Sequence, residues 1–244
     1  MRARPASLHA LPPLCLLLSS CAGLFHSDAQ PEQTYYLRAA GAGGTSGSAG
    51  GAASANGTAD NSTVAPAAAR LSLRVGHMSG GPGLESPHIM LLQPDHRMNF
   101  YTGSRRPAPA PDLVEALTVQ TLRASGAWSS VEDSTSPFPS EYLLQVTLRR
   151  FEADYTSGAG AAPLVYVVLD CIIGRRDGRN VVATFVASGS APAAANRLAE
   201  VVAAFEQATG AALDTLSQQA VQAARADVQR AAQNAANPEA SIRR

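Results

Sequence analysis

Residues 164–188 read LVYVVLDCIIGRRDGRNVVATFVAS, two apolar runs separated by a short charged turn. The first run, Leu164–Ile173, is almost wholly apolar, as expected of a strand in the middle of a sheet. Asp177-Gly178 is a dipeptide that favours a tight hairpin turn, and Val181–Ser188 then forms the returning strand. The stretch therefore predicts an antiparallel hairpin to which the rest of the domain is added.

Shorter strands are predicted before this hairpin from apolar residues that alternate with polar ones. They lie at Tyr35–Leu37, Leu71–Val75, Ile89–Leu92, Met98–Tyr101 and near Trp128–Val131. A longer strand follows from Leu144 to Tyr155, and its apolar residues change phase near Arg149-Arg150. One extra residue in a strand produces such a phase change, so a β-bulge is predicted there.

Two helices complete the expected fold. Asp112 and Glu115 have the spacing of a capping box, and Gly126 stands where a left-handed residue ends a helix. From about Ala193 to Arg225 apolar residues recur at helical spacing, although a glycine costs about 1 kcal/mol in a helix interior and Gly210 could bend or break it. The sequence thus predicts an α+β domain, a largely antiparallel sheet with both helices packed on one face.

The N-terminus has the layout of an export signal. Residues 11–23 read LPPLCLLLSSCAG and follow two arginines, and the apolar run is shorter than the roughly 20 residues that span a bilayer. Its end, Leu18-Ser19-Ser20-Cys21, resembles the lipobox of bacterial lipoproteins, in which the cysteine thiol receives a diacylglyceryl group. Cys21 is therefore the predicted lipidation site and residues 1–20 the signal peptide. An ordinary secretory signal cut after Ala29 is the alternative.

The remaining chain divides by composition. Residues 21–38 hold the anchor and the first strand, and residues 39–70 are dominated by Ala, Gly and Ser. Such a segment cannot bury enough surface to offset the entropy of ordering it, so it is predicted to be a disordered linker. Residues 71–225 form the folded domain, and residues 226–244 are expected to fray.

Composition and cysteine usage exclude several functions. The formal net charge is zero, whereas a nucleic-acid-binding protein shows a basic balance or stripe. The sequence contains no lysine, which a P-loop ATPase requires. Of the three cysteines, Cys15 leaves with the signal and Cys21 carries lipid. Cys171, inside an apolar strand, is interpreted as a buried structural thiol.

No active site is visible in the sequence. His77, His88 and His96 do not have the spacing of a metal site and are interpreted as solvated or hydrogen-bonded side chains. Asp170 is expected on a solvent-facing or edge position. Arg105-Arg106 and Arg175-Arg176 are interpreted as loop charges, with contact to lipid headgroups as the weaker alternative. No catalytic, cofactor-binding or metal-binding residue and no cofactor is predicted.

The order of these elements resembles that of the ABC-type transport auxiliary lipoproteins. The resemblance covers Cys21–Leu37 and about Leu71–Val221, including the strand that leads to Phe151 and the final helix with Phe205. The chain departs from the family pattern in its long linker and in lacking a tryptophan beside Arg105-Arg106.

The resemblance implies a non-catalytic lipoprotein that faces the periplasm. Ala22 after Cys21 implies export to the outer membrane, with lipid contact through the acyl anchor. The implied partners are an MCE-domain protein and the ABC permease of a lipid transport system, and a homo-oligomer is left open. A structural or assembly lipoprotein of the cell envelope is the alternative, and an exported enzyme whose residues meet only in space is a third.

Overall fold

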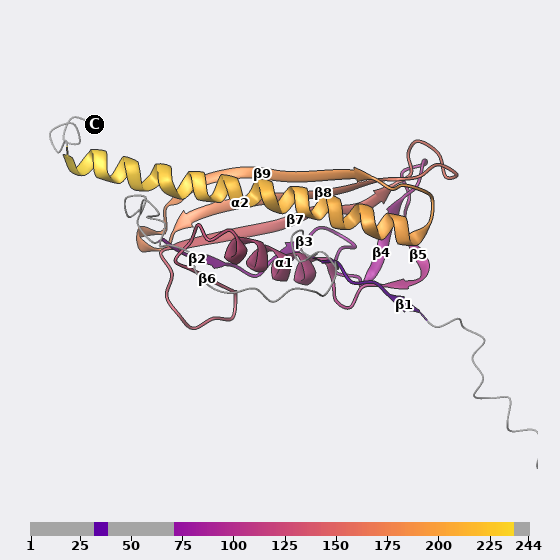
Figure 1. Ribbon diagram of the computed structural model, residues 1–244, viewed down its shortest axis with the longest axis horizontal. Helices are drawn as coiled ribbons and strands as arrows, with labels where there is room; N and C mark the ends of the chain where they lie inside the picture. The colour runs from indigo at the N-terminus through magenta and orange to yellow at the C-terminus, as the bar shows by residue number, and fades with distance from the viewer. Residues whose placement is uncertain (1–31, 39–70, 237–244) are drawn as a thin grey trace, which may run out of the picture. The chain divides into compact units, whose positions relative to one another are not determined.

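The predicted hairpin lies at one side of the sheet in the computed structural model, which describes residues 32–38 and 71–236 (Figure 1). Strand β8, Leu164–Arg175, pairs in antiparallel fashion with β9, Val181–Pro192. The turn between them is a short 3₁₀ helix, Asp177–Arg179, in which Gly178 has a φ of 74°. Glycine reaches this left-handed region at no steric cost, which explains the Asp-Gly pair.

The centre of the sheet is β7, Tyr142–Asp154, which pairs with β8 along one edge. Its register shifts between Leu148 and Arg150, so the predicted β-bulge is confirmed. Along its other edge β7 pairs in parallel fashion with three short strands in succession. These are β2 at Ser72–Val75, β3 at Ser79–Gly80 and β4 at His88–Leu92.

Three further strands extend this second edge. β6, Ser130–Glu132, lies parallel to β2, and β5, Met98–Arg105, lies antiparallel to β4. β1, Gln33–Thr34, is parallel to β5 and ends before Tyr35, so the predicted strand at Tyr35–Leu37 is wrong. Within the described residues the sheet has nine strands, and the long β7, β8 and β9 make most of its pairing antiparallel.

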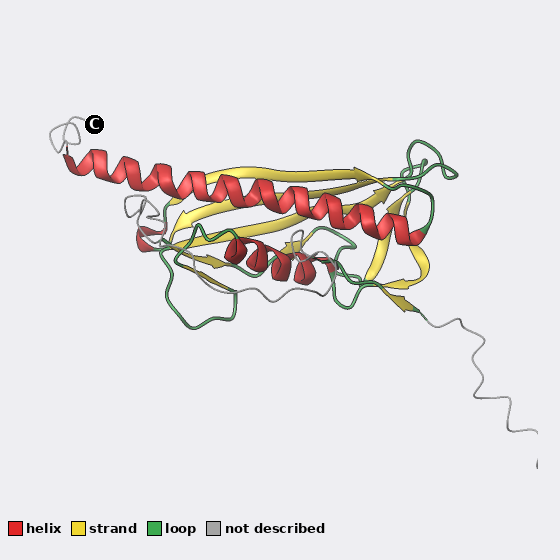
Figure 2. Cartoon of the chain, in the orientation of Figure 1, coloured by secondary structure: helices red, strands yellow, loops and turns green. Residues whose placement is uncertain are grey.

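Both helices lie on one face of the sheet, which confirms the predicted α+β architecture (Figure 2). Helix α1, Ala110–Ala124, packs near β6, β7 and β2, whereas α2, Leu198–Ala236, packs across β9 and β8. The core between the helices and the sheet is apolar, with Phe151 of β7 stacked on Phe205 of α2 at a centroid distance of 4.7 Å. Neither described helix has an apolar stretch long enough to cross a membrane.

The start of α1 differs from the prediction. The helix begins at Ala110, two residues before Asp112, and its N-cap residue is Pro109, which makes no side-chain capping bond. Pro111 in the first turn suits a helix start because its fixed φ is already helical and no N–H is needed there. The capping box of Asp112 and Glu115 is therefore wrong, while Gly126 has the expected left-handed φ of 62°.

Helix α2 continues unbroken through Gly210, and it ends at Ala236, beyond the predicted Arg225. Its packing on β9 depends on small residues, because Gly189 lies directly against the helix backbone at Ala208 and Ala212. Gly210 is buried in this helix, which is continuous there despite the low helix propensity of glycine.

Candidate functional site

The three histidines of the domain lie on different elements and have different partners. His77 follows β2, and its Nδ1 lies 3.2 Å from a carboxylate oxygen of Glu115. His88 is on β4 and its Nδ1 lies 3.0 Å from Ser86 Oγ, while His96 occupies the β4–β5 turn with a φ of 62°. Across residues 32–38 and 71–236, no group of three or more His, Cys, Asp or Glu side chains is arranged to hold a metal ion.

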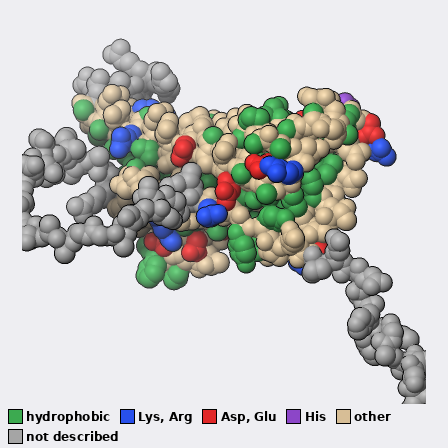
Figure 3. Space-filling model, turned by 45° about the vertical axis from the view of Figure 1, so that its right-hand side comes forward, with side chains coloured by type: hydrophobic (Ala, Val, Ile, Leu, Met, Phe, Trp, Pro, Cys, Tyr) green, Lys and Arg blue, Asp and Glu red, His purple; other side chains and the backbone are tan. Residues whose placement is uncertain are grey.

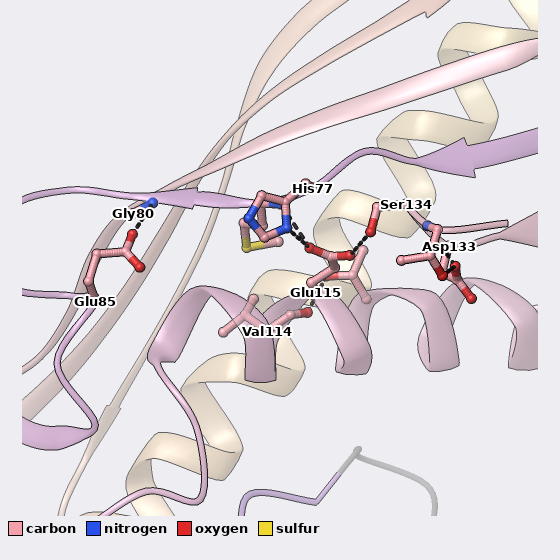
Figure 4. A network of polar contacts seen from close by, with 10 residues as sticks. His77, Gly80, Glu85, Val114, Glu115, Asp133 and Ser134 are labelled. Atoms are coloured by element: carbon pink, nitrogen blue, oxygen red, sulfur yellow. Dashed lines mark hydrogen bonds and ion pairs between the residues drawn. The ribbon is translucent and has the colours of Figure 1, made fainter.

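Glu115 instead forms a polar junction (Figure 4). Besides the contact with His77, it accepts a hydrogen bond of 2.8 Å from the Met78 N–H and one of 2.7 Å from Ser134 Oγ. These partners come from the β2–β3 loop and from the segment after β6. The Glu115 carboxylate therefore connects α1 to both segments. Local spacing predicts a helix cap at Glu115, because it does not reveal these distant partners.

Two neighbours on β8 behave as the sequence predicts. Asp170 faces solvent, and its carboxylate lies 3.1 Å from Arg149 Nη1 on β7. Cys171 points to the opposite face and is fully buried. Burial raises the pKa of its thiol to about 12, so the thiol is an unreactive part of the core.

Arg106 is placed differently from its sequence interpretation as a loop charge, which is wrong. Its side chain is only 2% exposed and its guanidinium lies 5.2 Å from the centre of the Phe151 ring. Nη2 donates a hydrogen bond of 2.6 Å to the Ser86 carbonyl, but Nε and Nη1 have no partner in the described part of the chain. Burial disfavours the charged form and lowers the pKa of Arg106 to about 10.

Arg175 and Arg176 also make defined contacts. The Arg175 Nε lies 2.7 Å from a carboxylate oxygen of Asp227, and its guanidinium lies over the Tyr142 ring. Since Asp227 belongs to the C-terminal part of α2, this ion pair links that part of the helix to β8. Arg176 reaches Ser140 Oγ at 3.3 Å through Nη1.

A groove of about 640 Å³ lies on the sheet face that the helices leave open. Its apolar floor includes Leu143 of β7 and Ile172 of β8, and Val181 lies at its edge. Arg176 and Arg179 contribute positive charge, and no acidic side chain lines the groove among the described residues. An apolar floor with basic side chains suits a partner surface that combines apolar and acidic side chains.

The groove continues onto an open strand edge. Within residues 32–38 and 71–236, β9 pairs only with β8, so its outer edge is unpaired. Soluble proteins usually protect such edges with charged residues, yet Val181–Pro192 contains none. Val181 and Val186 are also exposed. This combination of groove and edge, which we call the open-face surface, is the candidate docking surface.

The predicted lipidation site, Cys21, lies outside the described residues. Its modification therefore remains a prediction from the lipobox pattern. The open-face surface was not predicted, because its residues are adjacent only once β7, β8 and β9 are paired. The signal that could have indicated it is the absence of charge in residues 181–192.

The fold and this surface define a two-layer α+β domain with one open, grooved sheet face. The chain belongs to the family of ABC-type transport auxiliary lipoprotein components, whose family model matches residues 56–221. The resemblance inferred from the sequence is thus confirmed. The family description associates the chain with an ABC-type transport system as an auxiliary lipoprotein component.

Solved structures share this fold. A Xanthomonas campestris protein of the DUF330 family is 26% identical, with a TM-score of 0.60 over 65% of this chain and 88% of that one. A crystal structure of an uncharacterized protein shares the fold at 13% identity, with a TM-score of 0.51 over 62% of this chain and 92% of the other. None of the curated proteins compared matches the sequence.

Proposed function

We propose that this chain is an outer-membrane-anchored periplasmic lipoprotein that serves an MCE-type ABC system moving lipid between the two membranes. Cys21 carries the acyl chains, and the folded domain docks on the MCE protein without catalysing a reaction. The ABC permease of the same system is the more distant partner. The family match over residues 56–221 is the observation that carries this proposal.

The open-face surface supplies the docking site in this proposal. Its groove offers apolar area from Leu143 and Ile172, and Arg176 and Arg179 select an acidic partner surface. The free edge of β9 accepts a strand from the partner, a mode in which backbone hydrogen bonds give affinity. A second copy of the chain using the same edge would form the homo-oligomer that the sequence left open.

The N-terminal region supplies attachment and reach. Several acyl chains hold a protein on a membrane stably, whereas one chain holds it only marginally. Because β1 precedes residues 39–70 and is paired with β5, the stretch between Cys21 and Gln33 sets the distance between the anchor and the domain in this proposal. A flexible stretch of that length spans about 20 Å on average.

In-cell photocrosslinking from the open-face surface tests the proposal. A photoreactive residue replaces Val186, and in a matched control it replaces Gln207, which is exposed on α2. We expect an MCE protein to be captured from position 186 and not from position 207. Mass spectrometry of the N-terminal peptide, with Cys21→Ser as its control, shows whether Cys21 carries the diacylglyceryl group.

The alternative, a structural or assembly lipoprotein of the envelope, predicts a different result. Position 186 would then capture outer-membrane or wall-linked proteins and no MCE component. That outcome would overturn the transport role while leaving the lipid anchor intact.

A further inference from the structure

The hairpin formed by β4 and β5 carries exposed apolar side chains at one end of the sheet. Met98 is 54% exposed and Phe100 is 41% exposed, and none of the residues from Met98 to Gly103 is buried. Alternate residues of a strand share a face, so Met98 and Phe100 point the same way. Figure 3 turns this end of the domain partly toward the viewer and shows hydrophobic side chains on that half of the molecule, with charged ones among them and at its edge.

The first described strand lies beside the same hairpin. β1 pairs in parallel with the last residues of β5, with Gln33 opposite Ser104 and Thr34 opposite Arg105. Gln33 therefore lies beside the strand that carries Met98 and Phe100.

The chain between Cys21 and Gln33 is short enough for Cys21 and the tip of the hairpin to lie at the same membrane. Gln33 is the twelfth residue after Cys21, and a chain of that length spans about 20 Å on average and about 40 Å when fully extended. Met98 precedes Ser104 by six residues, which span at most about 20 Å. A Cys21 anchored in lipid thus holds the tip of the hairpin close to the lipid surface.

The hairpin and the candidate docking groove lie at opposite ends of β7. β4 pairs with Ala153 and Asp154 at the end of β7, whereas Leu143 of the groove lies at its beginning. Figure 1 shows β4 and β5 at one end of the long strands and β2 and β6 at the other. With the hairpin on a membrane, the groove faces away from it.

We propose that the β4–β5 hairpin rests on the lipid surface that holds Cys21, with the Met98 and Phe100 side chains in the interfacial region of the bilayer. This inference rests on the proposed lipidation of Cys21. At the tip, Arg97 is paired with Asp95 at 2.5 Å, so the contact is apolar and requires no anionic lipid.

Fluorescence quenching in vesicles tests the inference. The lipidated full-length protein, as Phe100→Cys or as the matched control Val186→Cys, is labelled with an environment-sensitive fluorophore and bound to phosphatidylcholine vesicles that contain spin-labelled lipid. Val186 is 48% exposed, similar to Phe100, and lies on β9. The buried Cys171, whose pKa is raised to about 12, does not compete for the label. Circular dichroism checks that both variants are folded.

We expect at least threefold stronger quenching at position 100 than at position 186. Equal quenching at both positions in vesicle-bound, lipidated protein would show that the hairpin does not touch the bilayer and would overturn this inference alone. Absence of the diacylglyceryl mass on Cys21, with the protein remaining in the aqueous phase on flotation, would overturn the anchoring in the proposed function and this inference with it.

Discussion

Gly189 on β9 lies so close to α2 that a Cβ at this position would be 2.0 Å from the carbonyl oxygen of Ala208. Because the neighbour is backbone, it cannot turn aside as a side chain can. We expect Gly189→Ala to lower the free energy of unfolding by about 3 kcal/mol, the upper end of the usual cost of overpacking. Urea unfolding followed by circular dichroism measures the change.

Gly160 is the matched control for this substitution. A Cβ there meets no atom within 4 Å, so Gly160→Ala should change the free energy of unfolding by less than about 1 kcal/mol. Equal effects of the two substitutions would contradict the close packing of α2 on β9.

For Arg106, unlike Gly189, an apolar substitution of similar volume is not expected to lower the free energy of unfolding. Its guanidinium is buried with Nε and Nη1 unpartnered in the described part of the chain, and replacing buried charges by apolar groups of similar volume is often neutral or stabilising. We expect Arg106→Met to leave the free energy of unfolding at neutral pH unchanged or to raise it by about 1 kcal/mol. Arg106→Ala, which also removes the packed stem, should lower it by about 2 kcal/mol or more.

Thermal and urea unfolding of both Arg106 variants give the comparison. A loss of more than about 2 kcal/mol in Arg106→Met would mean that the contacts of the guanidinium with Ser86 and Phe151 outweigh the cost of burying its charge.

Substitutions of Glu115 and Asp112 distinguish the observed contacts of Glu115 from the helix capping that the sequence predicted. Glu115→Ala leaves the Met78 N–H without its acceptor, and an unsatisfied buried donor costs about 1–3 kcal/mol. Asp112→Ala should cost less than about 0.5 kcal/mol, as is usual for an exposed side chain. If Asp112 capped the helix, its replacement would cost about 0.5–2 kcal/mol, and urea unfolding of both variants distinguishes the two cases.

Cys171 should resist alkylation in the folded protein. With its pKa raised to about 12 by burial, only about one thiol in ten thousand is ionised at pH 8, and the sulfur is also inaccessible. Iodoacetamide should modify Cys171 only after denaturation, as read by intact mass. Rapid labelling of the native protein would contradict its burial.

Tyr101 should make the protein sensitive to alkali. Burial, together with the hydrogen bond of 2.8 Å between the Tyr101 and Tyr155 hydroxyls, raises the pKa of Tyr101 above its ordinary value near 10. A group whose pKa is raised by folding contributes stability below its unfolded pKa, and this contribution falls as the pH rises beyond it. The free energy of unfolding should therefore fall above about pH 10, and less steeply in Tyr101→Phe. Parallel slopes for the two proteins would contradict this assignment.

Local sequence predicted those features that depend on neighbours along the chain. The Asp177-Gly178 turn, the phase change at Arg149-Arg150 and the left-handed Gly126 each follow from a few adjacent residues, and all three are present. The alternation of Leu73 and Val75 likewise indicated a strand with one buried face. Such signals are reliable because backbone geometry is determined largely over short distances.

The sequence predictions were wrong for residues whose role depends on a partner far away in the sequence. Arg106 reads as a loop charge until Phe151 and the Ser86 carbonyl are placed beside it. Glu115 has capping-box spacing, but its carboxylate is engaged by Met78 and Ser134 instead. The open-face surface is also a product of strand pairing, so no single stretch of sequence carries its signature.

The central position of β7 has a consequence for how the chain becomes folded. A growing polypeptide appears from its N-terminus, so β2, β3 and β4 exist long before the strand that holds all three together. Contacts between such distant segments slow folding, because a large loop must close before any of them forms. Pairs such as β4–β5 can form early, but the two halves of the sheet are joined only once β7 is made.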